Sequence, residues 1–321
     1  MRLTAVPCAP VPGRLSEGPV WDPHSEELLW VDITAGLIHR GTLVARDDGS
    51  GLPDVLPRVL LALGHPVGAV ASCRSGTLLA AAGTAFLQVV DTGAPGEFAR
   101  PALPDDGVRR RMNDAKCDPR GRLLAGTMAV DATPGAGSLY RLDPDGRVST
   151  LLDSVTISNG LGWSPDGCLL YYADSRTRRV DVFDYDLDSG TIANRRPFVT
   201  FDEGEPDGLA VDTAGRVWVA VWGAGQVRAF EADGSPHAVV EVAASHVSSC
   251  AFAGPDLDVL IITTAREGLT SEQLRAEPDA GRLFACRPGA TGLSVGQFAD
   301  IPLTSSPDGS PSSPFAALPD Q

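Results

Sequence analysis

A short pattern of hydrophobic and turn-forming residues recurs six times along this 321-residue chain. Each copy holds an alternating hydrophobic run, a turn rich in Asp, Pro, Ser or Gly, and a second apolar run, as in NGLGWSPDGCLLYYAD. The six copies begin at Glu17, Val67, Asn113, Asn159, Asp207 and Ser249. Their spacings of 50, 46, 46, 48 and 42 residues are typical of propeller blades, which repeat every ~40 to 50 residues. The sequence therefore predicts an all-β fold, a six-bladed β-propeller with four-stranded blades.

The propeller assignment also predicts how the chain is organised into domains. A single blade cannot bury both of its faces, so six blades must stack around a closed ring, and we expect residues 1–321 to form one domain. Residues 1–12 precede the first copy and are expected to supply an outer strand that closes the last blade. Residues 305–321 are rich in Ser and Pro and are expected to form a loosely held tail.

Composition excludes several other classes of protein. The formal net charge of -15 argues against binding to nucleic acid, because such binding needs clustered Lys and Arg, and the basic run at residues 109–111 is too short to provide it. The apolar stretches are too short to span a membrane, and the six cysteines form no CxxC pair. We expect a cytoplasmic protein, either a monomer or a small homo-oligomer, that does not bind membranes.

The first residues of the six copies share one repeat phase. In a propeller the innermost strands lie beside a central channel, so residues at the start of those strands converge at one mouth of it. Four of the six carry carboxylate or amide oxygens, the kind that hard cations prefer: Glu17, Asn113, Asn159 and Asp207. Asn and Asp also occur at such positions simply as turn formers, but two buried carboxylates on one axis need compensation. We therefore predict one divalent metal ion held by Glu17, Asn159 and Asp207, with Ca²⁺, Mg²⁺ or Mn²⁺ favoured by the oxygen ligands and Zn²⁺ possible.

Several phrases of the sequence carry a resemblance to a known family. They include SEGPVW at 16–21, RMNDAKCDPRGRLLAGTM at 111–128, ISNGLGWSPDG at 157–167 and PDGLAVDTAGRVWVA at 206–220. In these phrases the chain resembles the gluconolactonase and regucalcin family, also called the senescence marker protein family. The resemblance implies a six-bladed propeller that hydrolyses aldonolactones with a metal held by residues matching Glu17, Asn159 and Asp207.

The same resemblance implies three contacts with the substrate, a small sugar lactone. The family's substrate-contacting positions correspond to Arg111, Asn113 and Asp131, and the last of these is a glutamate in regucalcin-like members. The shorter side chain of Asp131 is a departure that bears on the sugar preference. Arg111 also lies in the basic run and is alternatively a surface charge.

A lactonase mechanism follows from the metal prediction. A divalent cation polarises the lactone carbonyl and lowers the pKa of a bound water. Asp207 is the candidate general base, with a metal-bound hydroxide as the competing nucleophile. Two other functions remain open, a metal-dependent esterase or phosphotriesterase on the same scaffold and a calcium-binding regulatory propeller without catalysis.

Three further side chains are interpreted mainly as structural residues. Asp32 and Asp174 occupy corresponding positions at the ends of the second strands of their repeats, which favours a structural function. Trp222 is interpreted as a packing residue or as the floor of a sugar pocket.

Overall fold

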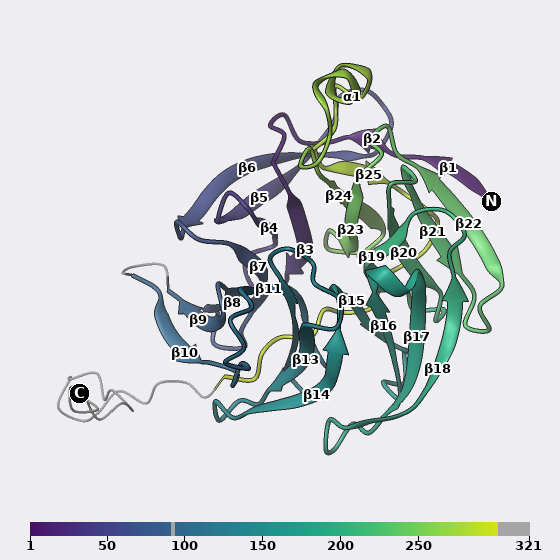
Figure 1. Ribbon diagram of the computed structural model, residues 1–321. Coiled ribbons are helices and arrows are strands. Elements are labelled where there is room, and N and C mark those ends of the chain that lie inside the picture. The colour runs from purple at the N-terminus through teal and green to yellow at the C-terminus, as the bar shows by residue number, and fades with distance from the viewer. Residues whose placement is uncertain (91–93, 301–321) are drawn as a thin grey trace.

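Six sheets, antiparallel except for one added edge strand, are arranged around a common axis in the computed structural model, which describes residues 1–90 and 94–300 (Figure 1). This confirms the predicted six-bladed propeller with four-stranded blades. The tail expected at residues 305–321 lies outside the described residues. In the part of the chain that is described, no helix is long and apolar enough to cross a membrane.

The first three blades follow the chain in order, with the earliest strand of each blade nearest the axis. The first blade comprises β3 (Ser16–Asp22), β4 (Glu27–Asp32), β5 (Leu37–Ala45) and β6 (Pro53–Ala62). The second comprises β7 (Val67–Ser72), β8 (Leu78–Ala82), β9 (Ala85–Val89) and β10 (Gly96–Ala99). The third comprises β11 (Arg110–Cys117), β12 (Leu123–Ala129), β13 (Gly137–Leu142) and β14 (Val148–Val155).

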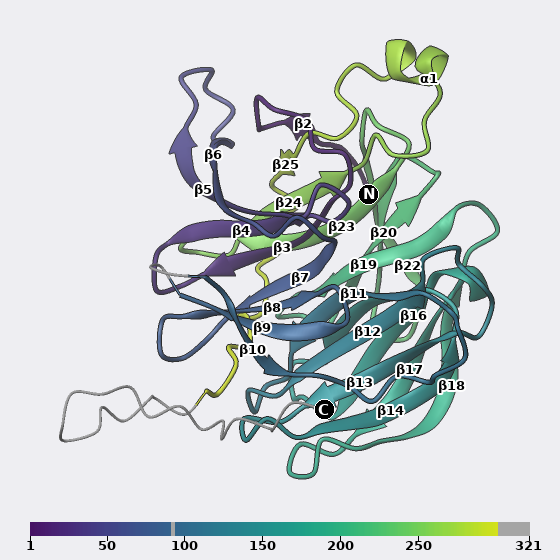
Figure 2. The ribbon, with the colours of Figure 1, turned by 60° about the vertical axis from the view of Figure 1, so that its left-hand side comes forward.

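The remaining three blades complete the ring. The fourth comprises β15 (Ser158–Trp163), β16 (Leu169–Asp174), β17 (Arg179–Tyr185) and β18 (Ile192–Thr200), with a 3-10 turn at Ser175–Thr177. The fifth comprises β19 (Glu205–Val211), β20 (Val217–Trp222), β21 (Gln226–Phe230) and β22 (Pro236–Glu241). The sixth has β23 (Val247–Ala253), β24 (Val259–Thr264) and β25 (Phe284–Cys286). A short helix, α1 (Ser271–Ala276), lies in the loop between β24 and β25 and stands clear of the blades (Figure 2).

The N-terminal segment, expected to close the last blade, is divided between two blades. Its second strand, β2 (Val6–Pro7), pairs antiparallel with β25 and is the outermost strand of the sixth blade. Its first strand, β1 (Arg2–Thr4), instead pairs in parallel with β22 and adds a fifth strand to the fifth blade. The segment thus bridges the two blades, an arrangement that strands of three and two residues do not reveal in the sequence.

Hydrophobic side chains fill the interfaces between blades, and glycines let the inner strands approach one another. A Cβ atom at Gly160 would collide with the backbone oxygen of Asp207, and one at Gly208 would collide with the side chain of Ser249. Each of these glycines follows the first residue of its repeat. The glycines therefore allow the polar residues before them to be drawn together at the axis.

Asp32 and Asp174 have equivalent structural roles in two blades. The carboxylate of Asp174 accepts hydrogen bonds from the backbone N–H groups of Thr156 and Ile157, both at 3.0 Å. Asp32 accepts from Arg14 at 2.7 Å and Leu15 at 3.1 Å in the same way. Each aspartate thus fixes the backbone just before an inner strand.

We predict that Asp174→Asn lowers the free energy of unfolding by ~1–3 kcal/mol, because the new amide group turns a donor toward a buried N–H. Urea denaturation of the purified variant measures the change. The exposed Asp256→Asn serves as the matched control and should lie within ~0.5 kcal/mol of the wild type. Equal stability of all three proteins would contradict the assigned role.

Candidate metal centre

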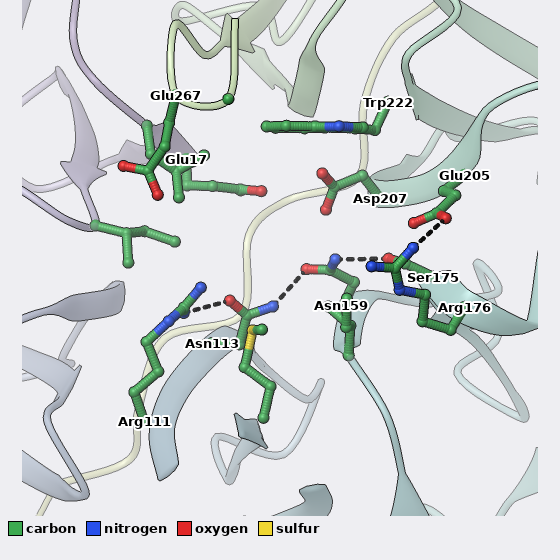
Figure 3. A pocket seen from close by; sticks show the side chains of 15 residues that line it. Glu17, Arg111, Asn113, Asn159, Ser175, Arg176, Glu205, Asp207, Trp222 and Glu267 are labelled. Carbon is green, nitrogen blue, oxygen red and sulfur yellow. Dashed lines mark hydrogen bonds and ion pairs between the residues drawn. The ribbon is translucent and has the colours of Figure 1, made fainter. Parts of the chain in front are cut away.

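The starts of the inner strands meet at one mouth of the central channel. Glu17, Asn113, Asn159 and Asp207 come from four different blades, and each is no more than 6% exposed. They line a cavity of about 380 Å³ (Figure 3). Its other lining residues are Leu15, Ile33, Arg111, Met128, Ile157, Ser175, Arg176, Glu205, Trp222, Glu267 and Gly268.

The carboxylates of Glu17 and Asp207 lie close together without a compensating cation. Burial raises the pKa of Glu17 well above its usual range, and the negative charges of Asp207 and Asp114 raise it further. Burial, reinforced by the charge of Asp114, also raises the pKa of Asp207. Among the described residues, no Lys, Arg or His nitrogen lies within 4.0 Å of these carboxylates, and the buried Oδ1 of Asp207 has no hydrogen-bond partner. A cation between the two carboxylates would supply the missing compensation.

Hydrogen bonds fix the orientation of the amide groups beside the carboxylates. The guanidinium of Arg111 donates to Oδ1 of Asn113 at 2.6 Å, and Nδ2 of Asn113 donates to Oδ1 of Asn159 at 2.8 Å. Nδ2 of Asn159 then donates to Ser175 at 2.8 Å, and the Ser175 hydroxyl donates to the backbone oxygen of Pro206 at 2.7 Å. Because a guanidinium only donates and a carbonyl only accepts, both ends of this chain of bonds set the same polarity. It leaves Oδ1 of Asn159 a second lone pair on the axis side, where Figure 3 places Asp207 and Glu17.

The donor set at this mouth fits a hard divalent cation. Within residues 1–90 and 94–300, no three His, Cys, Asp or Glu side chains are grouped as metal ligands, so these residue types alone supply no third ligand here. Glu17, Asp207 and Asn159 supply two carboxylates and one amide oxygen, which are ligands that Ca²⁺ and Mg²⁺ prefer. The unpartnered Oδ1 of Asp207 is the clearest sign of the fit.

Arg111 brings a positive charge to the wall of the same cavity. Its guanidinium donates to Asn113 and to the backbone oxygen of Met112 at 3.0 Å. Burial lowers the pKa of Arg111, and the negative charges of Glu17 and Glu267 act in the opposite direction. No carboxylate lies within 4.0 Å of it in the described part of the chain, so some of its five N–H donors remain for a ligand.

Asp131 is not brought together with the other predicted residues. It is exposed, it follows the end of β12 in a turn, and it does not line the cavity. Its Oδ1 accepts hydrogen bonds from the backbone N–H and the hydroxyl of Thr133, at 3.1 Å and 2.7 Å. The Asp131 carboxylate thus holds its own turn, in which Ala132 has a φ of +56°.

Two acidic residues of the cavity lining, Glu205 and Glu267, were not predicted from the sequence. Glu205 lies two residues before Asp207 on β19 and pairs with Arg176 at 2.8 Å, so strand alternation alone places it on the same face as Asp207. Glu267 follows the end of β24 in an irregular loop, where the repeat gives no signal. Trp222, for which the sequence allows packing or sugar binding, lines the cavity, and the centre of its ring lies 4.1 Å from that of the stacked His246 ring.

The carboxylate pair makes a prediction about stability in the absence of metal. A carboxyl group whose pKa is raised in the folded state stabilises the fold fully only at pH values below its unfolded pKa of ~4. That stability is lost as the pH rises through the folded pKa. Asp207→Asn removes one of the two buried charges. We expect the metal-free variant to be more stable than the wild type at pH 8 by at least ~1 kcal/mol, since one pKa unit corresponds to ~1.4 kcal/mol.

The same variant should lose the rise in melting temperature that added Ca²⁺ gives the wild type. Thermal denaturation with a chelator and with Ca²⁺ measures both effects, with Asp256→Asn as the control. A variant that is less stable without metal and still responds fully to Ca²⁺ would refute this account of the pair.

Comparisons with known proteins agree with the fold and the sequence phrases. Residues 15–266 match the family described as SMP-30/Gluconolactonase/LRE-like region. Regucalcin from Bos taurus is 37% identical over 298 residues, which cover 90% of this chain and 94% of the bovine protein.

Two solved structures are similar over nearly the whole chain. A calcium-binding protein, regucalcin from Agrobacterium tumefaciens, has a TM-score of 0.83 at 29% identity, covering 92% of this chain and 98% of its own. A luciferin-regenerating enzyme has a TM-score of 0.78 at 28% identity, covering 90% of this chain and 96% of its own. The resemblance expected from the sequence is confirmed, and the chain belongs to the SMP-30/gluconolactonase/LRE-like family.

Proposed function

We propose that this protein is a metal-dependent hydrolase that opens sugar lactones to the corresponding aldonic acids. The observation that carries the proposal is the buried pair of Glu17 and Asp207. No cationic side chain of the described residues lies within 4.0 Å of either carboxylate, and the pair lines a cavity with free donors on Arg111. Membership of the gluconolactonase family supports the choice of lactones among possible substrates.

Glu17, Asn159 and Asp207 would hold the metal ion. When bound there, a divalent cation would polarise the lactone carbonyl and lower the pKa of a water molecule. Calcium is the first ion to test, because the oxygen donors suit it and the Agrobacterium regucalcin is described as calcium-binding.

Asp207 is the residue to which we assign the role of general base. Its Oδ1 has no hydrogen-bond partner among the described residues, so one oxygen of the carboxylate can face the cation while the other accepts a proton from water. Burial raises its pKa above the usual range of a carboxyl group, which makes it a stronger base, although a ligated cation would draw the pKa down again.

Arg111 and Asn113 form the opposite side of the cavity. The remaining guanidinium donors of Arg111 would stabilise the negative charge that develops on the lactone carbonyl oxygen. Asn113 holds that guanidinium in place at 2.6 Å and would contact the substrate beside it. Since Asp131 lies outside the cavity lining, we assign its expected role, accepting hydrogen bonds from sugar hydroxyls, to Glu205 and Glu267.

The test is hydrolysis of a panel of aldonolactones, gluconolactone among them, followed by proton release. Turnover should disappear with a chelator and return with one of Ca²⁺, Mg²⁺, Mn²⁺ or Zn²⁺. Asp207→Ala should reduce kcat by at least about a hundredfold, as expected for loss of a general base. The exposed Asp256→Asn should leave kcat and KM unchanged.

Two results would overturn the proposal in favour of other functions. Tight Ca²⁺ binding with no turnover of any lactone above the spontaneous rate would indicate a calcium-binding regulatory propeller. Metal-dependent cleavage of carboxylic esters or phosphotriesters without lactone hydrolysis would indicate an esterase on the same scaffold.

Trp222 generates a separate prediction about substrate binding. Its indole spans the cavity above Asp207 (Figure 3) and is held by the stacked ring of His246, whose Nδ1 lies 3.0 Å from the backbone oxygen of Glu267. An aromatic face so placed would pack against a sugar ring. We expect Trp222→Leu to raise KM roughly fivefold, or about 1 kcal/mol, with kcat and Ca²⁺ affinity little changed.

Steady-state kinetics and calcium titration of the Trp222→Leu variant distinguish these quantities. His246→Phe, which retains a stacking ring, is the matched control and should change KM less. An unchanged KM for Trp222→Leu would show that the indole only packs.

A further inference from the structure

The inner strands lead from the metal centre to a second cavity at the opposite mouth of the channel. All six inner strands begin at the mouth that holds the metal centre, so their last residues lie together at the opposite mouth. Residues at those far ends include Val20, Cys117, Trp163, Val211 and Phe252. All five line a cavity of about 520 Å³ that shares no lining residue with the cavity of the metal centre.

A segment near the end of the described chain forms one wall of this second cavity. The backbone oxygen of Thr291 accepts a hydrogen bond from Thr213 of the fifth blade at 2.8 Å. Further along, Phe298 donates to Ser72 and accepts from Arg74, both at 2.9 Å, beside the second blade. Between these anchors, residues 293–297 line the cavity, and Figure 1 shows the segment as a yellow trace crossing the ring.

Lys116, the one lysine of the sequence, lines this cavity, and the negative charge of Asp114 opposes the lowering of its pKa by burial. Its Nζ donates to the backbone oxygen of Leu209 at 2.6 Å. No carboxylate lies within 4.0 Å of it among the described residues, and two of its three N–H donors have no assigned partner there. One N–H of the ammonium is thus bonded to the backbone of Leu209, and the other two are available to a ligand.

Other donors and apolar groups surround the ammonium. The indole N–H of Trp163, a residue that is 94% buried, has no hydrogen-bond partner in the described part of the chain. Ser164 and Gln297 add polar groups, whereas Val20 and Phe252 supply apolar wall. A cation would be repelled by the ammonium of Lys116.

We infer that this second cavity binds a small organic anion, a carboxylate with an apolar or aromatic body, with the anionic group on Lys116 and the body against the apolar wall. The site is independent of the lactonase proposal, because none of its residues touches the metal centre cavity.

The probe for this site is 2-naphthoate, titrated calorimetrically into the metal-free protein so that no metal ion can bind the carboxylate. The neutral isostere 2-naphthamide should bind at least tenfold more weakly. Lys116→Met, which keeps the length of the side chain without its charge, should weaken naphthoate binding by at least tenfold, and Lys116→Arg should weaken it less.

Arg111→Met is the matched control, because Arg111 is the cation of the other cavity. It should leave naphthoate binding unchanged. Loss of binding in Arg111→Met but not in Lys116→Met would place the anion in the metal centre cavity and overturn the inference. So would equal affinity for the amide, or the absence of any binding at millimolar naphthoate.

A second measurement on the wild-type protein covers the case in which Lys116→Met fails to fold. Because Lys116 is the one lysine, reductive methylation with formaldehyde and cyanoborohydride modifies a single side chain and the N-terminal amine. Naphthoate should slow methylation of Lys116 at least fivefold while leaving the N-terminal amine unaffected, as followed by peptide mass spectrometry. Equal rates with and without naphthoate would contradict the proposed site.

Discussion

The inner strands of all six blades run in one direction along a shared axis, and the chemistry of the molecule depends on that constraint. Residues that share a phase in the repeat are thereby brought to the same depth in the channel, although they lie 42 to 50 residues apart in the sequence. Gly160 and Gly208 have no side chain, which allows neighbouring inner strands to approach closely and draws these residues together at the axis. The polar side chains at the metal mouth are therefore neighbours by symmetry of the fold, without any local motif that joins them.

Bringing Glu17 and Asp207 together has a cost in stability. Both carboxylates are removed from water, and the pKa of each is raised by that burial. A fold selected only for stability would place apolar residues at these positions, as it does at Val67 in the second blade. The fold tolerates the pair because the hydrophobic interfaces between blades and the carboxylates of Asp32 and Asp174 hold the inner strands in place independently of the axis.

Repeat phase explains what the sequence predicts well and where it fails. It predicts the blades and places Glu17, Asn159 and Asp207 at one mouth, because those positions follow from strand geometry alone. It says nothing about Glu267, which lies in a loop without counterpart in the other repeats. The expectation for Asp131 rests on the family resemblance and not on repeat phase. Asp131 lies in a turn after a strand, where it bonds to Thr133 instead of lining the cavity. Pairing of β1 with the fifth blade depends on a contact between residues 2–4 and residues 239–241, which periodicity cannot report.

Charge balance along the axis connects the two mouths of the channel. Asp114 lies between them, and its pKa is raised by burial and lowered by the positive charge of Lys116. Glu17, Asp114 and Asp207, when ionised, place three negative charges along the channel, and Lys116 offsets one of them. A cation between Glu17 and Asp207 would offset the negative charge that these two carboxylates place at the metal mouth. Lys116 acts on the same row of charges through Asp114 and presents its remaining donors at the other mouth.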